Sequence, residues 1–164
     1  MCEQIVLDLT SIIANPNKEF AVSVQFAPED SLVDYPQCGF DGKARFEGFA
    51  CFVDSEVELY GKIKFALRGV CDRCCKPTST EYVVPFDEVF YPSAEEFDDY
   101  VYEGSKLDAT KAFYDAISLS LPISFLCKED CKGLCPRCGK DRNEGDCQCN
   151  VPKNNYFSNI YTTK

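Results

Sequence analysis

The sequence predicts an α+β fold: an antiparallel β-sheet or small barrel, followed by one main C-terminal helix and a cysteine-rich zinc-ribbon-like module. Residues 57–67 alternate apolar and polar side chains with the period of a half-buried strand. Phe113, Ile117 and Leu121 recur at four-residue spacing, as on one face of a helix. Half of the twelve cysteines follow residue 126 at short spacings, which is typical of a metal-binding module.

The N-terminal part of the chain is expected to consist of strands. In the strand at 57–67, Gly61 interrupts the alternation, and a β-bulge is expected there. Turn-rich segments separate the shorter strand candidates. These candidates are residues 3–9, 19–26, 43–53 and 81–91.

An acidic segment and a helix follow the strands. Residues 92–106 contain many carboxylates and few aliphatic side chains, which predicts a mobile acidic loop. The helix is expected to open at Asp108 as its N-cap and to run to about Leu121, where Pro122 stops it. No internal repeat is apparent along the chain.

Charge and cysteine content divide the chain into three parts. Residues 1–105 carry 8 basic and 20 acidic side chains, a net charge of −12, and are expected to form an acidic antiparallel β domain. Residues 106–126 supply the helix and a linker packed on the sheet. Residues 127–164 form the cysteine-rich zinc-binding module and a tail. From residue 106 onward, 9 basic and 7 acidic side chains give a net charge of +2.

Composition restricts the partners and the compartment. A net charge of −10 argues against diffuse binding to nucleic acid, because that binding needs many lysine and arginine contacts to phosphate. No apolar run reaches the roughly 18 residues of a membrane helix, and the first residues lack the pattern of a signal peptide. We therefore expect a cytoplasmic protein without a membrane partner. In that reducing compartment, clustered thiols are more often metal ligands than disulfides.

Eight cysteines have the spacing of metal ligands, and the chain contains no histidine to share that role. Thiolates at short spacings can surround a tetrahedral zinc ion, so eight cysteines predict two zinc ions. The preferred partition assigns four cysteines to each ion. The first set is Cys71, Cys74, Cys127 and Cys131, and the second is Cys135, Cys138, Cys147 and Cys149.

Spacing alone does not determine this partition. Cys75 can replace Cys74, or the neighbouring sites can exchange ligands. The glycine after Cys138 allows the backbone to turn so that its amides point at the thiolates. The other cysteines are expected to be small side chains, buried or simply exposed; they are Cys2, Cys38, Cys51 and Cys75.

The absence of histidine also restricts catalysis. It removes the commonest general base and every nucleophile pair that depends on an imidazole. The chain has no glycine-rich phosphate-binding loop, and we expect neither an enzyme nor a small-molecule substrate. Cys71-x2-Cys74 has the spacing of thiol oxidoreductases, which is kept as a less favoured alternative because such motifs usually open a helix.

Several motifs occur together in the order and spacing of one family. They are Cys71-x-Arg73-Cys74, Leu107-Asp108 with Asp115, Leu119, Leu121 and Pro122, Cys127-x3-Cys131-Lys132-Gly133-Leu134-Cys135-Pro136-x-Cys138-Gly139, and Cys147-x-Cys149. Over roughly residues 55–150 the chain resembles the YceD family of large ribosomal RNA subunit accumulation proteins. Some relatives in that family lack the later cysteines, which favours the first set as the central site.

The resemblance implies a non-enzymatic factor for accumulation of large-subunit ribosomal RNA, and hence for assembly of that subunit. The implied partners are a basic large-subunit ribosomal protein, the large-subunit rRNA precursor, or both. Four side chains near the second cysteine set are candidates for RNA contact: Lys132, Arg137, Lys140 and Arg142. A generic zinc ribbon that binds nucleic acid or is linked to transcription is the alternative.

Overall fold

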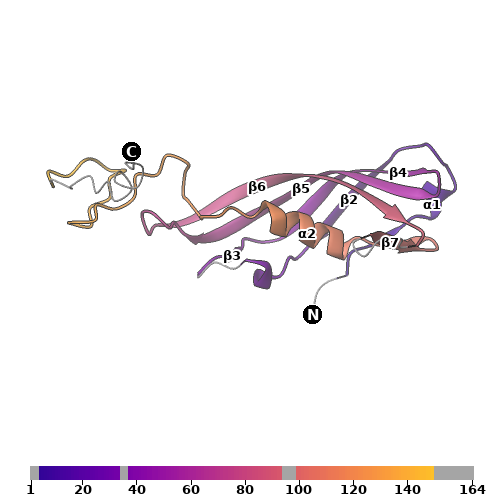
Figure 1. Cartoon of the computed structure of the whole chain (residues 1–164), viewed down its shortest axis with the longest axis horizontal. Coiled ribbons are helices and arrows are strands. Elements are labelled where there is room, and N and C mark those ends of the chain that lie inside the picture. Colours follow the sequence, from indigo (N-terminus) through magenta and orange to yellow (C-terminus); the bar gives the residue numbers. More distant parts are fainter. Residues whose placement is uncertain (1–3, 34–36, 94–98, 150–164) are drawn as a thin grey trace, which may run out of the picture.

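The computed structural model describes residues 4–33, 37–93 and 99–149. Within them the fold is mostly a curled half-barrel sheet with one main helix, α2, packed along it (Figure 1). The strand order is β1-β8-β7-β6-β5-β4-β2, with β3 paired to β5 beside this path. The strands are β1 Val6–Asp8, β2 Phe20–Phe26, β3 Gly39–Phe40, β4 Ala44–Val53, β5 Glu56–Val70, β6 Pro77–Tyr91, β7 Tyr100–Glu103 and β8 Lys106–Asp108. The helical segments are α1 Thr10–Ile13, the 3-10 turn η1 Asp30–Leu32 and α2 Thr110–Ser120.

The hairpin of β5 and β6 forms the long axis of the fold. Its antiparallel register runs without interruption from Val57 opposite Phe90 to Val70 opposite Pro77. Both strands are longer than the sequence pattern predicts, because the ladder continues up to the loop that carries Cys71 and Cys74. The paired ends of β5 and β6 that precede and follow this loop extend beyond β2 and β4 (Figure 1).

The prediction of a β-bulge at Gly61 is wrong. Gly61 lies opposite both Gly48 of β4 and Phe86 of β6 in regular register. A Cβ atom on Gly48 would overlap the carbonyl oxygen of Tyr60 and lie 2.8 Å from the Cα atom of Gly61. The two glycines thus allow a close approach of two backbones, which is the other established use of glycine within a strand.

The prediction of a mobile loop at 92–106 is corrected for the described residues of that range. Residues 100–103 and 106–108 form the strands β7 and β8, while residues 94–98 lie outside the described residues. Tyr102 is buried and donates its hydroxyl hydrogen bond to the carbonyl of Ser55. The acidic composition concealed a short hairpin in which Tyr102 and Leu107 are buried while Val101 is exposed.

The helix begins and ends inside its expected bounds. Asp108 belongs to β8, although its carboxylate still accepts a hydrogen bond from the backbone N–H of Thr110 at 2.9 Å. Leu121 is extended, with φ −60° and ψ 136°, because a residue before proline avoids the helical region. No helix in the described ranges is long and apolar enough to span a membrane.

Phe113 of α2 joins the helix to the sheet. Its ring lies 4.9 Å from the ring of Phe46, 4.9 Å from that of Phe86 and 5.5 Å from that of Phe26. Because these partners come from β4, β6 and β2, one helical side chain contacts three strands of the half-barrel in its core. The expected strand at 3–9 shortens to β1, which pairs with β8 just before the helix.

We predict that Gly48→Asn strongly destabilises the protein, because the new side chain meets the backbone of β5 rather than a movable side chain. The loss should be on the order of 2 kcal/mol or more in a chemical unfolding experiment. Gly104→Asn is the matched control, since Gly104 has φ +57° and open space around it, and asparagine tolerates that conformation. Similar unfolding midpoints for the two variants would contradict the close approach.

Candidate metal centre

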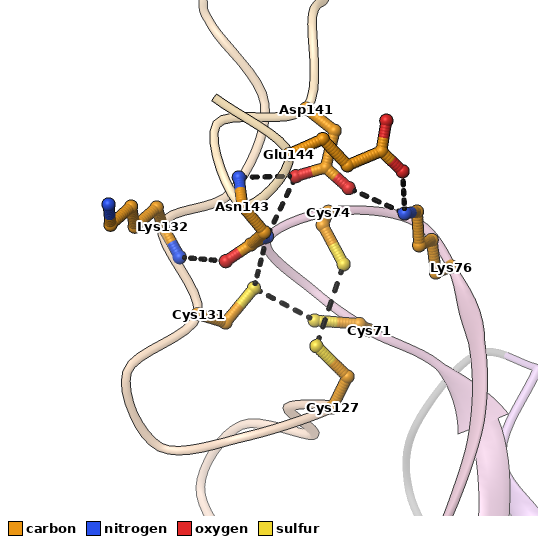
Figure 2. Close-up of polar contacts among 9 residues, drawn as sticks. All are labelled: Cys71, Cys74, Lys76, Cys127, Cys131, Lys132, Asp141, Asn143 and Glu144. Carbon is orange, nitrogen blue, oxygen red and sulfur yellow. Dashed lines mark hydrogen bonds and ion pairs between the residues drawn. The ribbon is translucent and has the colours of Figure 1, made fainter. Parts of the chain in front are cut away.

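The first cysteine cluster joins the tip of the β5–β6 hairpin to the chain that follows α2. The four Sγ atoms of Cys71, Cys74, Cys127 and Cys131 all lie within 4.8 Å of one another. Figure 2 shows the four side chains converging, with Cys71 and Cys131 joined at 3.8 Å and Cys74 and Cys127 at 3.7 Å. This grouping coincides with the first set preferred from spacing. Cys75 is exposed and lies outside both clusters found among the described residues.

The second cluster lies within the C-terminal segment. The Sγ atoms of Cys135, Cys138, Cys147 and Cys149 also lie within 4.8 Å of one another. Cys135 is buried, but Cys138 is exposed and the other two are half-buried. The second cluster is therefore open to solvent on one side, whereas Cys71 and Cys74 of the first are 0% and 4% exposed.

Each cluster begins with the same loop. Cys75 N–H donates to the carbonyl of Cys71 at 2.9 Å, and Gly139 N–H donates to that of Cys135 at 2.8 Å. Cys75 and Gly139 hold the same position with φ +57° and +73°. The absence of an internal repeat is therefore corrected, since Cys-x-Arg-Cys-x-Lys occurs twice, at 71–76 and 135–140.

Backbone amides in these loops favour the thiolate form of the first cysteine. Burial raises the pKa of Cys71, but hydrogen bonds from the backbone amides of Cys127, Cys74 and Arg73 outweigh it and lower that pKa to about 6. In the second loop, the amides of Arg137 and Cys138 lower the pKa of Cys135 to about 6. Each loop thus provides one thiol that ionises near neutral pH.

Other thiols in the clusters resist ionisation without a cation. Burial, together with neighbouring thiols, raises the pKa of Cys127 to about 12. The hydrogen bond with Cys138, followed by burial, raises the pKa of Cys149 to about 12. Four adjacent thiolates repel one another, and a divalent cation among them would remove that cost.

The spacing of the sulfur atoms fits a tetrahedral metal ion. Four Zn–S bonds of about 2.3 Å place the sulfur atoms about 3.8 Å apart, close to the 3.7 and 3.8 Å found in the first cluster. The donors are sulfur throughout in both clusters, which is typical of a closed structural site. Both clusters can thus hold a metal ion.

Side chains around the first cluster bind the two cysteine-bearing segments together. Arg73 donates a hydrogen bond to the carbonyl of Cys131 at 2.9 Å, and the carbonyl of Arg73 accepts one from Leu134 N–H at 3.0 Å. Asn143 donates its side-chain amide to Cys131 Sγ at 3.4 Å and accepts from Lys132 N–H (Figure 2). The Asn143 contact favours the thiolate, and the pKa of Cys131 is lowered despite its burial.

Lys76 connects the hairpin to the residues that follow the second Cys-x2-Cys loop. Its ammonium lies 2.8 Å from the Asp141 carboxylate and 2.5 Å from that of Glu144 (Figure 2). The Lys76 hydrogen bond is the largest cause that lowers the pKa of Asp141 to about 2, so this carboxylate is charged at neutral pH. The same two acids raise the pKa of Lys76.

Two hydrogen bonds between Asp72 and Phe125 complete the junction near the first cluster. Asp72 N–H donates to the carbonyl of Phe125, and Phe125 N–H donates to the Asp72 carboxylate at 2.7 Å. The Phe125 ring is fully buried beside Gly69. Two residues before Cys127, the chain is therefore already fixed to the hairpin tip.

Sequence reasoning missed the residues that orient the cysteines: Arg73, Lys76, Asp141 and Asn143. The signal for Lys76 was available, because Lys140 ends the second loop at the equivalent position. The four predicted RNA contacts Lys132, Arg137, Lys140 and Arg142 all lie exposed on the cysteine-rich segment. Among the remaining cysteines, Cys51 is buried and Cys38 half-buried, and Cys2 lies outside the described residues.

We predict that Lys76→Gln loosens residues 132–149 without unfolding the sheet, because it removes the cation shared by Asp141 and Glu144. Hydrogen exchange of the Leu134 and Arg142 amides, which bond to Arg73 and Gly133, should become faster. Lys128→Gln is the control, since Lys128 pairs only with Asp130, at 3.6 Å, among its described neighbours. Equal exchange rates in the two variants would show that the Lys76 contacts do not hold the segment.

Comparisons with known proteins identify relatives of the segment that contains both cysteine clusters. A family model described as "Large ribosomal RNA subunit accumulation protein YceD" matches residues 59–160. An uncharacterised protein of Mycobacterium tuberculosis is 33% identical over 94 residues, which cover 53% of this chain and 45% of that protein. An uncharacterised protein of Mycobacterium leprae is 27% identical over 95 residues, covering 53% and 43%.

A plant protein extends the match. The Arabidopsis thaliana protein named "Large ribosomal RNA subunit accumulation protein YCED homolog 1, chloroplastic" is 34% identical over 47 residues, 29% of this chain and 15% of its own. The matched segment thus spans less than half the length of these curated relatives. No solved structure matches the chain. Because the family model covers more than half of the sequence, including both cysteine clusters, the chain belongs to the YceD family of large ribosomal RNA subunit accumulation proteins.

Proposed function

We propose that the protein is a non-enzymatic, zinc-binding factor of the cytoplasm that supports accumulation of large-subunit ribosomal RNA and assembly of the large ribosomal subunit. The observation that carries this proposal is the pair of four-sulfur clusters within the segment that matches the family model. Their geometry suits a metal-stabilised scaffold better than a reactive centre. The family name supports the connection to large-subunit rRNA.

Zinc is the metal that suits these clusters best. An all-thiolate tetrahedral set selects zinc or iron, and zinc is the usual ion where Cys-x2-Cys loops form a closed structural site. Burial of Cys71 and Cys74 also argues against a thiol oxidoreductase, because a substrate disulfide needs access to an exposed sulfur. We therefore assign a structural role to the first ion. The second, more exposed cluster would organise the cysteine-rich segment.

The acidic end of the sheet supports a basic protein partner. Asp54, Glu56 and Asp99 line one pocket of about 450 Å³ at the turn between β4 and β5. Nearby, burial and then the charges of Asp87 and Asp115 raise the pKa of Glu88, as expected where carboxylates crowd together. A lysine or arginine side chain of a basic ribosomal protein would relieve this repulsion and be steered to it from a distance.

We predict that Cys71→Ser destabilises the whole protein, whereas Cys147→Ser mainly loosens the C-terminal segment. The first cluster joins positions more than fifty residues apart, so its loss frees both the hairpin tip and the chain after α2. Native mass spectrometry should show two zinc ions in the wild type and one in Cys147→Ser. Thermal unfolding then compares the two variants. One ion in the wild type, an iron–sulfur absorption band, or equal loss of thermal stability would contradict the assignment.

We also predict that the tagged full-length protein comigrates with large-subunit precursors in a sucrose gradient. After nuclease treatment a basic large-subunit protein should stay bound, with an affinity that falls as salt rises. Asp54→Asn combined with Glu56→Gln should weaken that association, because the pocket loses charge. Glu129→Gln combined with Asp130→Asn removes the same charge elsewhere and is the control. If nuclease releases every partner, the acidic end does not bind protein and RNA is the direct ligand.

A further inference from the structure

The outer face of β4 and β5, opposite the core, carries a band of cations. Along β5 the side chains on this face change from acidic at Glu56 and Glu58 to basic at Lys62, Lys64 and Arg68. Inward-facing residues of the same strand, such as Ile63, are buried, which shows that the basic side chains point away from the core. The negative charge of the first 105 residues is therefore not uniform over this face.

Two of these cations are direct neighbours on adjacent strands. Arg45 of β4 lies directly opposite Lys64 of β5, a like-charge pair that costs stability. Glu47 is shared by both, at 3.1 Å from Arg45 and 2.7 Å from Lys64. Among the described residues, Lys62 and Arg68 form no ion pair, and both are exposed. Glu47 thus pairs with two of the four cations, and Lys62 and Arg68 are available to an added anion.

Two aromatic rings continue this band, an exposed one on Phe49 and a half-buried one on Tyr60. Phe49 is 45% exposed and lies directly opposite Tyr60, with ring centroids 6.1 Å apart and planes inclined by 35°. The Tyr60 hydroxyl donates to the Glu19 carboxylate at 2.5 Å, which holds this ring in place. Lys62 follows Tyr60 by two residues on the same face, at about 6.6 Å along the strand. A fixed aromatic pair thus lies beside the cations.

A groove runs along the basic part of the face. It has a volume of about 330 Å³, and its charged lining consists of the cations Lys43, Arg45 and Lys64 and the carboxylates Asp41, Glu47 and Glu81. Val83, of β6, is 58% exposed although it lies opposite Lys64. The groove therefore offers cations, carboxylates and apolar atoms, and Lys62 and Arg68, which form no ion pair among the described residues, lie outside its lining.

We propose that this outer face of β4 and β5 binds single-stranded RNA, with bases against Phe49 and Tyr60 and phosphates along Lys62, Lys64, Arg45 and Arg68. Open sheets that bind single strands combine these two elements, because every base has a face that stacks and every linkage has a charge. An acidic peptide would use the cations but not the aromatic rings. The proposal deepens the proposed function by naming an RNA-binding surface, and it rests on that function for the identity of the RNA.

The cationic part is tested by fluorescence anisotropy with the metal-loaded full chain and a labelled uridine oligomer of about 12 nucleotides, within the site size of sheet-based binders. Lys62→Gln combined with Lys64→Gln should weaken binding several-fold. The slope of log affinity against log salt should become shallower by about 1.4, since two phosphate contacts are lost. Lys106→Gln combined with Lys111→Gln removes equal charge from β8 and α2 and should leave both quantities unchanged.

The aromatic part has a different signature. Phe49→Ala should weaken binding roughly tenfold with an unchanged salt slope, because stacking is not electrostatic. Ile123→Ala removes a more exposed apolar side chain elsewhere, 99% against 45%, and should have no effect. Circular dichroism and zinc content verify that every variant is folded.

Three outcomes would overturn the proposal: wild-type affinity in both the Lys62/Lys64 and Phe49 variants, equal losses in the control variants, or competition by polyglutamate as effective as that by RNA. The gradient experiment separates this failure from failure of the proposed function. If the wild type comigrates with large-subunit precursors but these variants bind the oligomer normally, only the surface assignment is wrong. If the wild type neither comigrates nor binds RNA, both proposals fail.

Discussion

The four thiols at the tip of the β5–β6 hairpin are the constraint on which the arrangement of the chain depends. Cys71 and Cys74 come from the hairpin, and Cys127 and Cys131 from the segment after α2, so the cluster closes a loop of more than fifty residues. β7, β8 and α2 all lie within that loop. Because Phe113 within it packs on three other rings of the core, the sulfur cluster and the aromatic core reinforce each other.

The two clusters begin with the same loop but differ in what surrounds them. The first has the β-sheet behind it, the Asp72–Phe125 contacts below it and Asn143 beside it. The second lies within its own segment, which contacts the hairpin through the Leu134 N–H bond to Arg73 and the ion pairs of Lys76 with Asp141 and Glu144. Lys76 is half-exposed, and salt screens such pairs. The position of the second cluster on the hairpin therefore depends more on solution conditions than that of the first.

Local patterns in the sequence indicate the longer strands, the helix and the cysteine loops, because each depends on short-range periodicity or spacing. Contacts between residues far apart in the sequence do not follow from these local patterns. The alternation around Gly61 does not show that Gly48 lies opposite it, so a bulge was the natural interpretation. The carboxylates of 92–106 conceal Tyr102, whose burial depends on neighbours far along the chain. Lys76 and Asp141 form their pair only because the first cluster brings their loops together.

The charge of the exposed side chains changes sign along β5, which the net charge of the chain does not show. Glu56 and Glu58 stand at the end that carries the acidic pocket, while Lys64 and Arg68 stand toward the cysteine loops. The net charge of −12 over residues 1–105 is a sum over both ends, and it describes neither. The two partners that we propose, a basic protein and an RNA strand, would accordingly be attracted to opposite ends of one hairpin. Each would approach a surface of the opposite sign, with the neutral ring of Tyr60 marking the change between them.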